Sequence, residues 1–247
     1  MEEAKLQFYH VALSPPSMVV ASLLGYLGIE YEDRVVDMLK REHKRQPFLS
    51  INPDGAVPAI SDKNYNLNEA IAISRYLVES REIDTPFYPY KDAKAVAKIN
   101  MLIDTAVADY RSKTGPLYLF TVTGPNFLGY PDPTNEEREK YFQLAFKGYD
   151  LLEKLLKRNE GDYLLGNDVT LADFYFFIFT MMIVTTTDAN LNNYPGVQDW
   201  YSKIEAIPAV ARVLRRRARM YRLAMFLVKW ILPLTCRCKC CKKTRKK

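Results

Sequence analysis

The chain has 247 residues, of which 48% are apolar, so it can bury a sizeable core in one large domain or two smaller ones. Residues 1–211 hold 21 basic and 29 acidic side chains, whereas residues 212–247 hold fourteen basic and no acidic ones. This acidic body excludes a protein that tracks nucleic acid over its whole surface, and the positive charge is concentrated where it can meet an anionic surface.

The cysteines are as unevenly placed as the charge. All four lie near the C-terminus, at Cys236, Cys238, Cys240 and Cys241. A body without cysteine carries no disulfide framework, and the N-terminal residues form no apolar leader segment. We therefore expect a cytoplasmic protein.

The first third of the chain predicts short strands that alternate with helices. Proline is tolerated in a first helical turn, so Pro15 and Pro16 mark a helix start, and Asn52-Pro53-Asp54-Gly55 predicts a turn. The expected order is β-α-β-α-β-β-α. In chain order the elements are strand 5–10, a helix from about 15 to 28, strand 31–36, a short polar helix 43–49, two strands flanking 63–64, and helix 69–80.

Beyond residues 84–92 the strand signals cease and helical patterns take over. Thr170-Leu171-Ala172-Asp173 predicts a capping box, in which the first and last side chains bond each other's backbone N–H groups. The helix that follows it is apolar on every side, which indicates the buried centre of a bundle. The expected helices cover residues 93–120, 135–158, 170–185, 197–206 and a stretch after 208.

This element order, with Val57-Pro58 before the third strand and the capping box in the helical part, resembles the cytosolic glutathione transferase family over about residues 5–211. The runs at 13–17 and 42–58 most resemble its theta and rho classes. The resemblance implies a homodimer that conjugates the glutathione thiolate to hydrophobic electrophiles, with glutathione as co-substrate and no metal. The expected parts are a thioredoxin-like glutathione-binding domain at 1–83, an all-helical domain at 93–211, and an amphipathic, basic, Cys-rich tail at 212–247.

The resemblance also implies the residues that bind glutathione. A cis peptide before Pro58 would turn the backbone N–H and C=O of Val57 toward the cysteinyl unit of the tripeptide. Glu69 would meet the free ammonium, while the backbone N–H of Ala70, at a helix N-terminus, would bind the γ-glutamyl carboxylate. His43 and Lys44 are the cationic candidates for the glycyl carboxylate.

Three positions depart from the family pattern. Ala56 stands where the family often has Lys or Gln, Ala70 where it usually has Ser or Thr, and Met18 where theta and rho chains commonly have Arg. These changes favour a second hypothesis, in which the chain is a non-catalytic adaptor or ligand-binding protein at a membrane.

The catalytic group should be a hydroxyl that donates to the glutathione sulfur and lowers the pKa of the thiol. Ser14, at the start of the first helix, is the preferred candidate. Tyr9 is its rival because other classes use a tyrosine at the end of the first strand, and Ser17 is a third candidate. The electrophile is expected near Tyr110, Tyr118 and Phe120, although these aromatics are equally compatible with a core.

The tail is the part that least resembles the family. Its apolar run from Leu223 to Leu234 is interrupted by Lys229 and is shorter than the ~20 residues that a membrane-spanning helix needs. It can instead lie in an anionic membrane interface, where the four cysteines become candidates for S-palmitoylation. A soft-metal site, a nuclear localisation signal and a solvated basic end are the alternatives. We expect a peripheral protein on a cytosolic membrane face.

Overall fold

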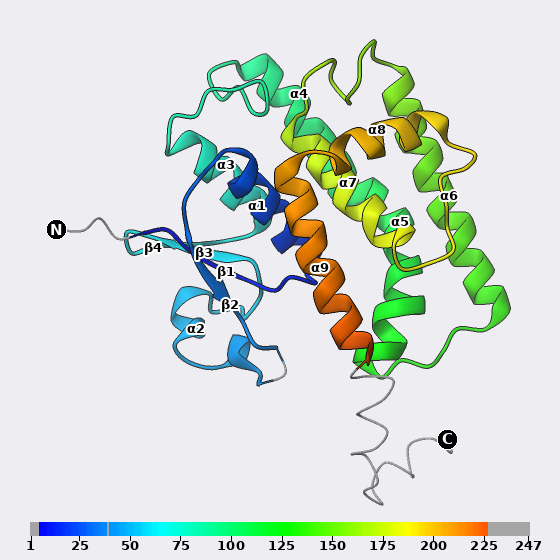
Figure 1. The fold of residues 1–247 in the computed structure, drawn as a ribbon, viewed down its shortest axis with the longest axis horizontal. Helices are drawn as coiled ribbons and strands as arrows, with labels where there is room; N and C mark the ends of the chain where they lie inside the picture. Colours follow the sequence, from blue (N-terminus) through cyan, green and yellow to red (C-terminus); the bar gives the residue numbers. More distant parts are fainter. Residues whose placement is uncertain (1–4, 39, 227–247) are drawn as a thin grey trace, which may run out of the picture.

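The computed structural model describes residues 5–38 and 40–226 of the chain (Figure 1). An N-terminal thioredoxin-like domain, built around one sheet, is followed by a helical domain. The strands are β1 (Gln7–His10), β2 (Glu32–Val35), β3 (Ala59–Asp62) and β4 (Tyr65–Asn68). Their order is β2-β1-β3-β4, with β1 parallel to β2 and the other two pairs antiparallel.

Strand alternation gives the sheet two buried faces. Phe8 and Ile60 belong to the main core, together with residues of α1 (Pro15–Tyr26) and α3 (Ala70–Glu79). Ala59 and the partly buried Tyr9 belong to a smaller cluster with Phe48, on the face covered by α2 (Phe48–Ile51). The side on which a residue of β1 or β3 lies therefore decides which helices it contacts.

Two sequence predictions in this domain differ in outcome. The tight turn between β3 and β4 is confirmed, with Lys63 and Asn64 at φ values of 50° and 70°. The single polar helix expected over residues 43–49 is wrong, because the structure has a 3₁₀ turn, η1 (Glu42–Lys44), and then α2. Pro47 lies between the two pieces and has no N–H for a continuous helical ladder.

The predicted helix over 93–120 is longer and less regular than expected. Prolines 116 and 125 lie inside it and lack the N–H of a regular helix, and two stretches of the run are π-helical. The run comprises α4 (Ala93–Asp104), η2 (Thr105–Tyr110), α5 (Arg111–Tyr118) and η3 (Leu119–Leu128). The remaining helices are α6 (Asn135–Lys157), α7 (Leu171–Val184), α8 (Pro195–Glu205) and α9 (Pro208–Phe226).

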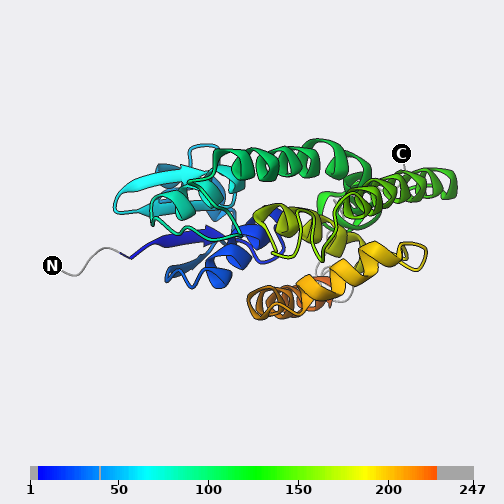
Figure 2. The same cartoon turned by 90° about the horizontal axis from the view of Figure 1, so that it is seen from above.

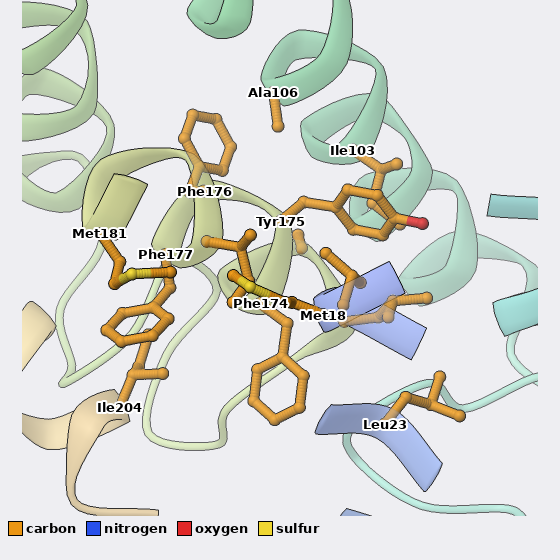
Figure 3. Packing of buried hydrophobic residues seen from close by; sticks show 14 of the residues in the cluster. Met18, Leu23, Ile103, Ala106, Phe174, Tyr175, Phe176, Phe177, Met181 and Ile204 are labelled. Atoms are coloured by element: carbon orange, nitrogen blue, oxygen red, sulfur yellow. The ribbon is translucent and has the colours of Figure 1, made fainter. Parts of the chain in front are cut away.

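Helix α7 is the centre of the helical domain, as its all-round apolar sequence predicts. Phe174, Tyr175, Phe176 and Phe177 project from it in different directions (Figure 3), and all four are at most 2% exposed. Its first turn closes as a capping box, in which the buried Asp173 carboxylate also accepts from the Trp200 indole N–H at 2.8 Å. Figure 2 shows α7 between α4 on one side and α9 on the other.

Helix α9 joins the two domains. It packs against α1, and Arg216 donates to both carboxylate oxygens of Asp33 on β2, at 3.3 and 2.9 Å. Residues 212–226, expected as the start of the tail, continue this helix. Residues 227–247 and their four cysteines lie outside the described residues. Over the part of the chain that the structure describes, no helix has the length and apolar character needed to cross a bilayer.

Candidate functional site

Hydrogen bonds from asparagine side chains hold two loops of the N-terminal domain together. Asn52 is fully buried, donates to the Ala56 carbonyl at 2.8 Å and accepts from the Asp54 backbone N–H at 3.1 Å. Asn68, at the end of β4, donates to Asn52 Oδ1 at 2.8 Å and to Asp54 Oδ2 at 3.2 Å. The turn at 52–55 is thereby held against the residue that precedes Glu69.

These loops form one wall of a cavity of about 260 Å³, which we call the loop pocket. The Val57–Pro58 peptide is cis, as the family resemblance implies, and both residues line the pocket. The opposite wall comes from the helical domain. The lining residues are Pro16, Asn52, Asp54, Ala56, Val57, Pro58, Asn68, Glu69, Ala70, Ile71, Val107, Arg111, Tyr175 and Phe179.

Glu69 has an unusual backbone. Its φ of 67° is a conformation that costs a non-glycine residue about 1–3 kcal/mol and that clusters at binding sites. It is the N-cap of α3, its exposed carboxylate makes no cap hydrogen bond, and Ala70 behind it is buried. The first N–H groups of α3 and one free carboxylate are thus presented together at the pocket wall.

Ser14 lies at the edge of the site. It is the N-cap of α1, and its Oγ accepts from the Ser17 backbone N–H at 3.4 Å, so its own hydroxyl proton is available to a ligand. Ser14 is not among the residues that line the loop pocket, although Pro16 is. Pro15 lines a second cavity described below.

Tyr9 has a different environment. Its hydroxyl donates to Gln7 Oε1 at 2.7 Å, and its ring packs on Phe48 with centroids 5.8 Å apart. It lies in the small cluster on the α2 side of the sheet and lines neither cavity. The Tyr9 hydroxyl is therefore already used by a neighbour on its own strand.

His43 and Lys44 contact the turn at residues 54–55 and are not among the lining residues of the loop pocket. Lys44 Nζ donates to the backbone carbonyl of Asp54 at 3.0 Å. Burial lowers the pKa of His43, and the neighbouring Lys44 and Arg41 lower it further. Gly55 has a φ of +63°, and a Cβ there would lie 2.5 Å from the His43 carbonyl oxygen, so this close packing requires glycine.

A second cavity of about 500 Å³, the apolar pocket, lies within the helical domain and against the start of α1. Tyr118 and Phe120, two of the residues expected near an electrophile, line it. Tyr110 does not, because it is fully buried and its hydroxyl lies 2.6 Å from Thr180 Oγ1, while burial raises its pKa. The lining residues are Pro15, Val107, Ala108, Arg111, Ser112, Thr114, Gly115, Pro116, Tyr118, Leu119, Phe120, Thr123, Phe179, Met182 and Ile183.

The two pockets share Val107, Arg111 and Phe179, so they adjoin along one strip of the helical domain. Arg111 is exposed and has neither an ion pair nor a hydrogen bond to any residue that the structure describes. The Tyr175 hydroxyl is buried without a hydrogen-bond partner, and burial raises its pKa, so it keeps its proton. Sequence reasoning missed both residues, since no local motif marks them.

The fold and the position of this site define a thioredoxin-like domain whose cis-proline loop faces a helical domain. Two family models match the chain, the glutathione S-transferase N-terminal domain over residues 4–79 and its C-terminal domain over residues 125–217. Together they span most of the chain, which belongs to the glutathione S-transferase family.

Individual relatives agree with this assignment. The chain is 28% identical to glutathione S-transferase 3 of Zea mays, covering 85% of this chain and 94% of the relative. It is 27% identical to glutathione S-transferase theta-2 of Mus musculus, with 81% of each chain covered. The crystal structure of glutathione transferase F7 from Populus trichocarpa superposes with a TM-score of 0.75 at 25% identity, covering 85% of this chain and 98% of that one.

Metal ligands do not gather in the site. Within residues 5–38 and 40–226, no group of three or more His, Cys, Asp or Glu side chains is arranged to hold a metal ion. The cysteine cluster lies outside those residues.

Proposed function

We propose that the chain is a theta-like glutathione transferase that binds glutathione in the loop pocket and a hydrophobic electrophile in the apolar pocket. The observation that carries this proposal is the shared strip of Val107, Arg111 and Phe179, which puts a cavity with several polar lining side chains beside a mainly apolar one. Two substrates held in adjoining cavities react as if in one molecule, which lowers the entropic part of the barrier.

In the loop pocket, each end of glutathione has a matching group. The Val57 backbone pairs with the cysteinyl unit, the Glu69 carboxylate accepts from the ammonium, and the N–H of Ala70 donates to the γ-glutamyl carboxylate. Lys44 and His43 contact residues 54–55 without lining the pocket, so we assign them the support of this turn and a long-range attraction for the glycyl carboxylate.

Ser14 is the proposed thiol-activating group. Its free hydroxyl proton can donate to the sulfur, and the N-terminus of α1 favours a negative charge there. The thiol releases its proton to water, and the thiolate lone pair then forms a C–S bond with the electrophilic carbon. The bond to the leaving group breaks with its electron pair or, in an addition, a neighbouring atom takes up a proton.

Retention on immobilised glutathione and conjugation of 1-chloro-2,4-dinitrobenzene test this proposal. We expect the intact chain to be retained. For Ser14→Ala we expect kcat/KM to fall by about 100-fold, which corresponds to the loss of one hydrogen bond to a charged group. Ser202→Ala, an exposed site on α8, is the matched control. Retention without turnover would favour the non-catalytic hypothesis, and loss of both would overturn the glutathione site itself.

We also propose that the chain is a homodimer tethered to a cytosolic membrane face. Arg212, Arg215, Arg219 and Arg222 recur at helical spacing on the exposed side of α9 and have no carboxylate partner among the described residues. Further basic residues follow in the sequence after 226. Anionic lipid headgroups attract a basic surface by about 1 kcal/mol per charge. Acylation of the four cysteines would add the second anchoring signal.

Sedimentation with phosphatidylcholine vesicles that contain or lack phosphatidylserine tests the electrostatic anchor. Binding that needs phosphatidylserine and falls at high salt would support it. Replacing the four cysteines by serine, with and without hydroxylamine treatment of the cell-derived protein, tests the acyl anchor. Equal partitioning of all forms would remove the tether, and light scattering gives the oligomeric state separately.

A further inference from the structure

A third cavity lies along α1, and its lining includes Ala12 and Ser17, which flank Ser14 in the sequence, although Ser14 itself does not line it. It has a volume of about 280 Å³, near the lower end of the range of about 300–1,000 Å³ for small-molecule pockets. It shares no lining residue with the loop pocket or the apolar pocket. Its walls come from β1, α1 and α9, so we call it the α1–α9 cavity.

Helix α9 is held against the N-terminal domain at two points, and the cavity lies between them. At one end Gly25 and Ala209 are in close contact, since a Cβ on Gly25 would be 3.2 Å from the Ala209 Cβ. At the other end Arg216 bonds Asp33, whose Oδ1 also lies 2.5 Å from His10 Nε2. Two helical turns, about 10 Å, separate Ala209 from Arg216, which is room for an extended aliphatic chain.

The chemistry of the walls favours an apolar ligand with one anionic end. Met18, Leu24 and Val213 line the cavity with hydrocarbon. Ser17 also lines it, is 1% exposed, and its hydroxyl has no hydrogen-bond partner. A buried hydroxyl normally has a partner, so a ligand that accepts from Ser17 would satisfy an existing need.

The charges at the rim of the cavity favour a negatively charged ligand. Arg216 is neutralised by Asp33, whereas Arg212, one turn earlier on α9, is exposed and has no ion pair within the part of the chain that the structure describes. One positive charge is therefore left over at the cavity. We propose that the α1–α9 cavity binds a linear aliphatic carboxylate of medium length, with Arg212 binding the carboxylate and the hydrocarbon lying between α1 and α9.

Such a ligand would have a structural effect at the base of the tail. It would contact α1 and α9 together and hold the last described helix against the N-terminal domain. Because the cavity is separate from both substrate pockets, this binding does not depend on the proposed transferase activity.

Calorimetric titration of the full chain with decanoate tests this site. We expect one binding site that persists when S-hexylglutathione saturates the substrate pockets. Decanol has no negative charge and cannot form the ion pair with Arg212. It should therefore bind at least about tenfold more weakly. Arg212→Ala should weaken decanoate binding by about tenfold.

Two further variants sharpen the result. Arg215→Ala removes an exposed arginine of the same stripe that does not line the cavity, and it should bind decanoate as the parent does. Ala21→Phe places a ring in the cavity and should abolish binding. If this variant does not fold, the two arginine variants decide. Absence of decanoate binding, its loss with S-hexylglutathione, or equal affinity of the Arg212→Ala and parent proteins would overturn the proposal.

Discussion

The two walls of the loop pocket are built in different ways. On the N-terminal wall, the side chains of Asn52 and Asn68 bond each other and the Asp54 turn, so these polar groups are used within the protein. On the helical wall, Arg111 has no partner in the described part of the chain and the Tyr175 hydroxyl is buried without one. The asparagine-bonded part of the first wall is a rigid template, whereas the second wall has side-chain donors left over for a ligand.

This difference separates stability from binding. A change that disrupts the N-terminal wall should unfold the loops and lower the free energy of unfolding. Removal of the Arg111 side chain or of the Tyr175 hydroxyl, on the helical wall, should leave the empty protein intact and affect only the complex. Variants of the two walls can therefore be distinguished by measuring unfolding and ligand affinity on the same proteins.

The largest effect should follow Asn52→Ala. This change removes three hydrogen bonds at a fully buried position and leaves the Ala56 carbonyl and the Asp54 N–H without their partner. We expect a loss of about 3 kcal/mol in the free energy of unfolding, measured with urea. The control Asn66→Ala removes one exposed bond to the Ser50 carbonyl and should cost less than about 1 kcal/mol. Equal losses of unfolding free energy in the two variants would mean that the hydrogen bonds of Asn52 do not stabilise this wall.

A smaller effect, on catalysis alone, is expected for Arg111→Ala. The guanidinium lies where the two pockets adjoin and has no ion pair to lose, so stability should change by less than about 0.5 kcal/mol. We expect kcat/KM to fall by about tenfold, because a positive charge beside the reacting sulfur is lost. Lys113→Ala is the control, since Lys113 pairs with Asp109 on the same helical run and lines neither pocket. Unchanged kcat/KM in Arg111→Ala would remove this residue from the site.

The same contrast explains which parts of the site the sequence could predict. The turn at Asn52 and the start of α3 are short-range features, so local patterns predicted them correctly, whereas the cis Val57–Pro58 peptide was implied by the family resemblance. Arg111 and Tyr175 reach the pocket only through the packing of α7 against α1 and of α5 against α7, and neither has a local signature. The helix that begins at residue 93 was predicted to end at 120 but continues to 128, because its last stretch is a π-helix that contains Pro125 and has no local signature.

For Tyr175→Phe we expect opposite effects on the two measurements. Removing a buried hydroxyl without a partner should leave the unfolding free energy unchanged or slightly higher. Glutathione affinity should fall about fivefold, the equivalent of one neutral hydrogen bond of about 1 kcal/mol. Tyr149→Phe is the matched control, because the Tyr149 hydroxyl is also buried and unpartnered but lies outside both pockets. A similar affinity loss in both variants would show that the Tyr175 hydroxyl has no specific role.

The smallest effect on catalysis is expected for Tyr9→Phe, and it separates the two candidate hydroxyls. The Tyr9 hydroxyl donates to Gln7, so its loss should cost about 1 kcal/mol of stability through that bond. Because the ring lies on the α2 side of the sheet with Phe48, kcat/KM should stay within about twofold of the parent, whereas Ser14→Ala should lose about 100-fold. A thiol pKa measured for bound glutathione should likewise rise in Ser14→Ala and not in Tyr9→Phe. If Tyr9→Phe instead raised that pKa, the tyrosine would have to leave Gln7 and turn toward the pocket, and the N-terminal wall would not be the rigid template that its hydrogen bonds indicate.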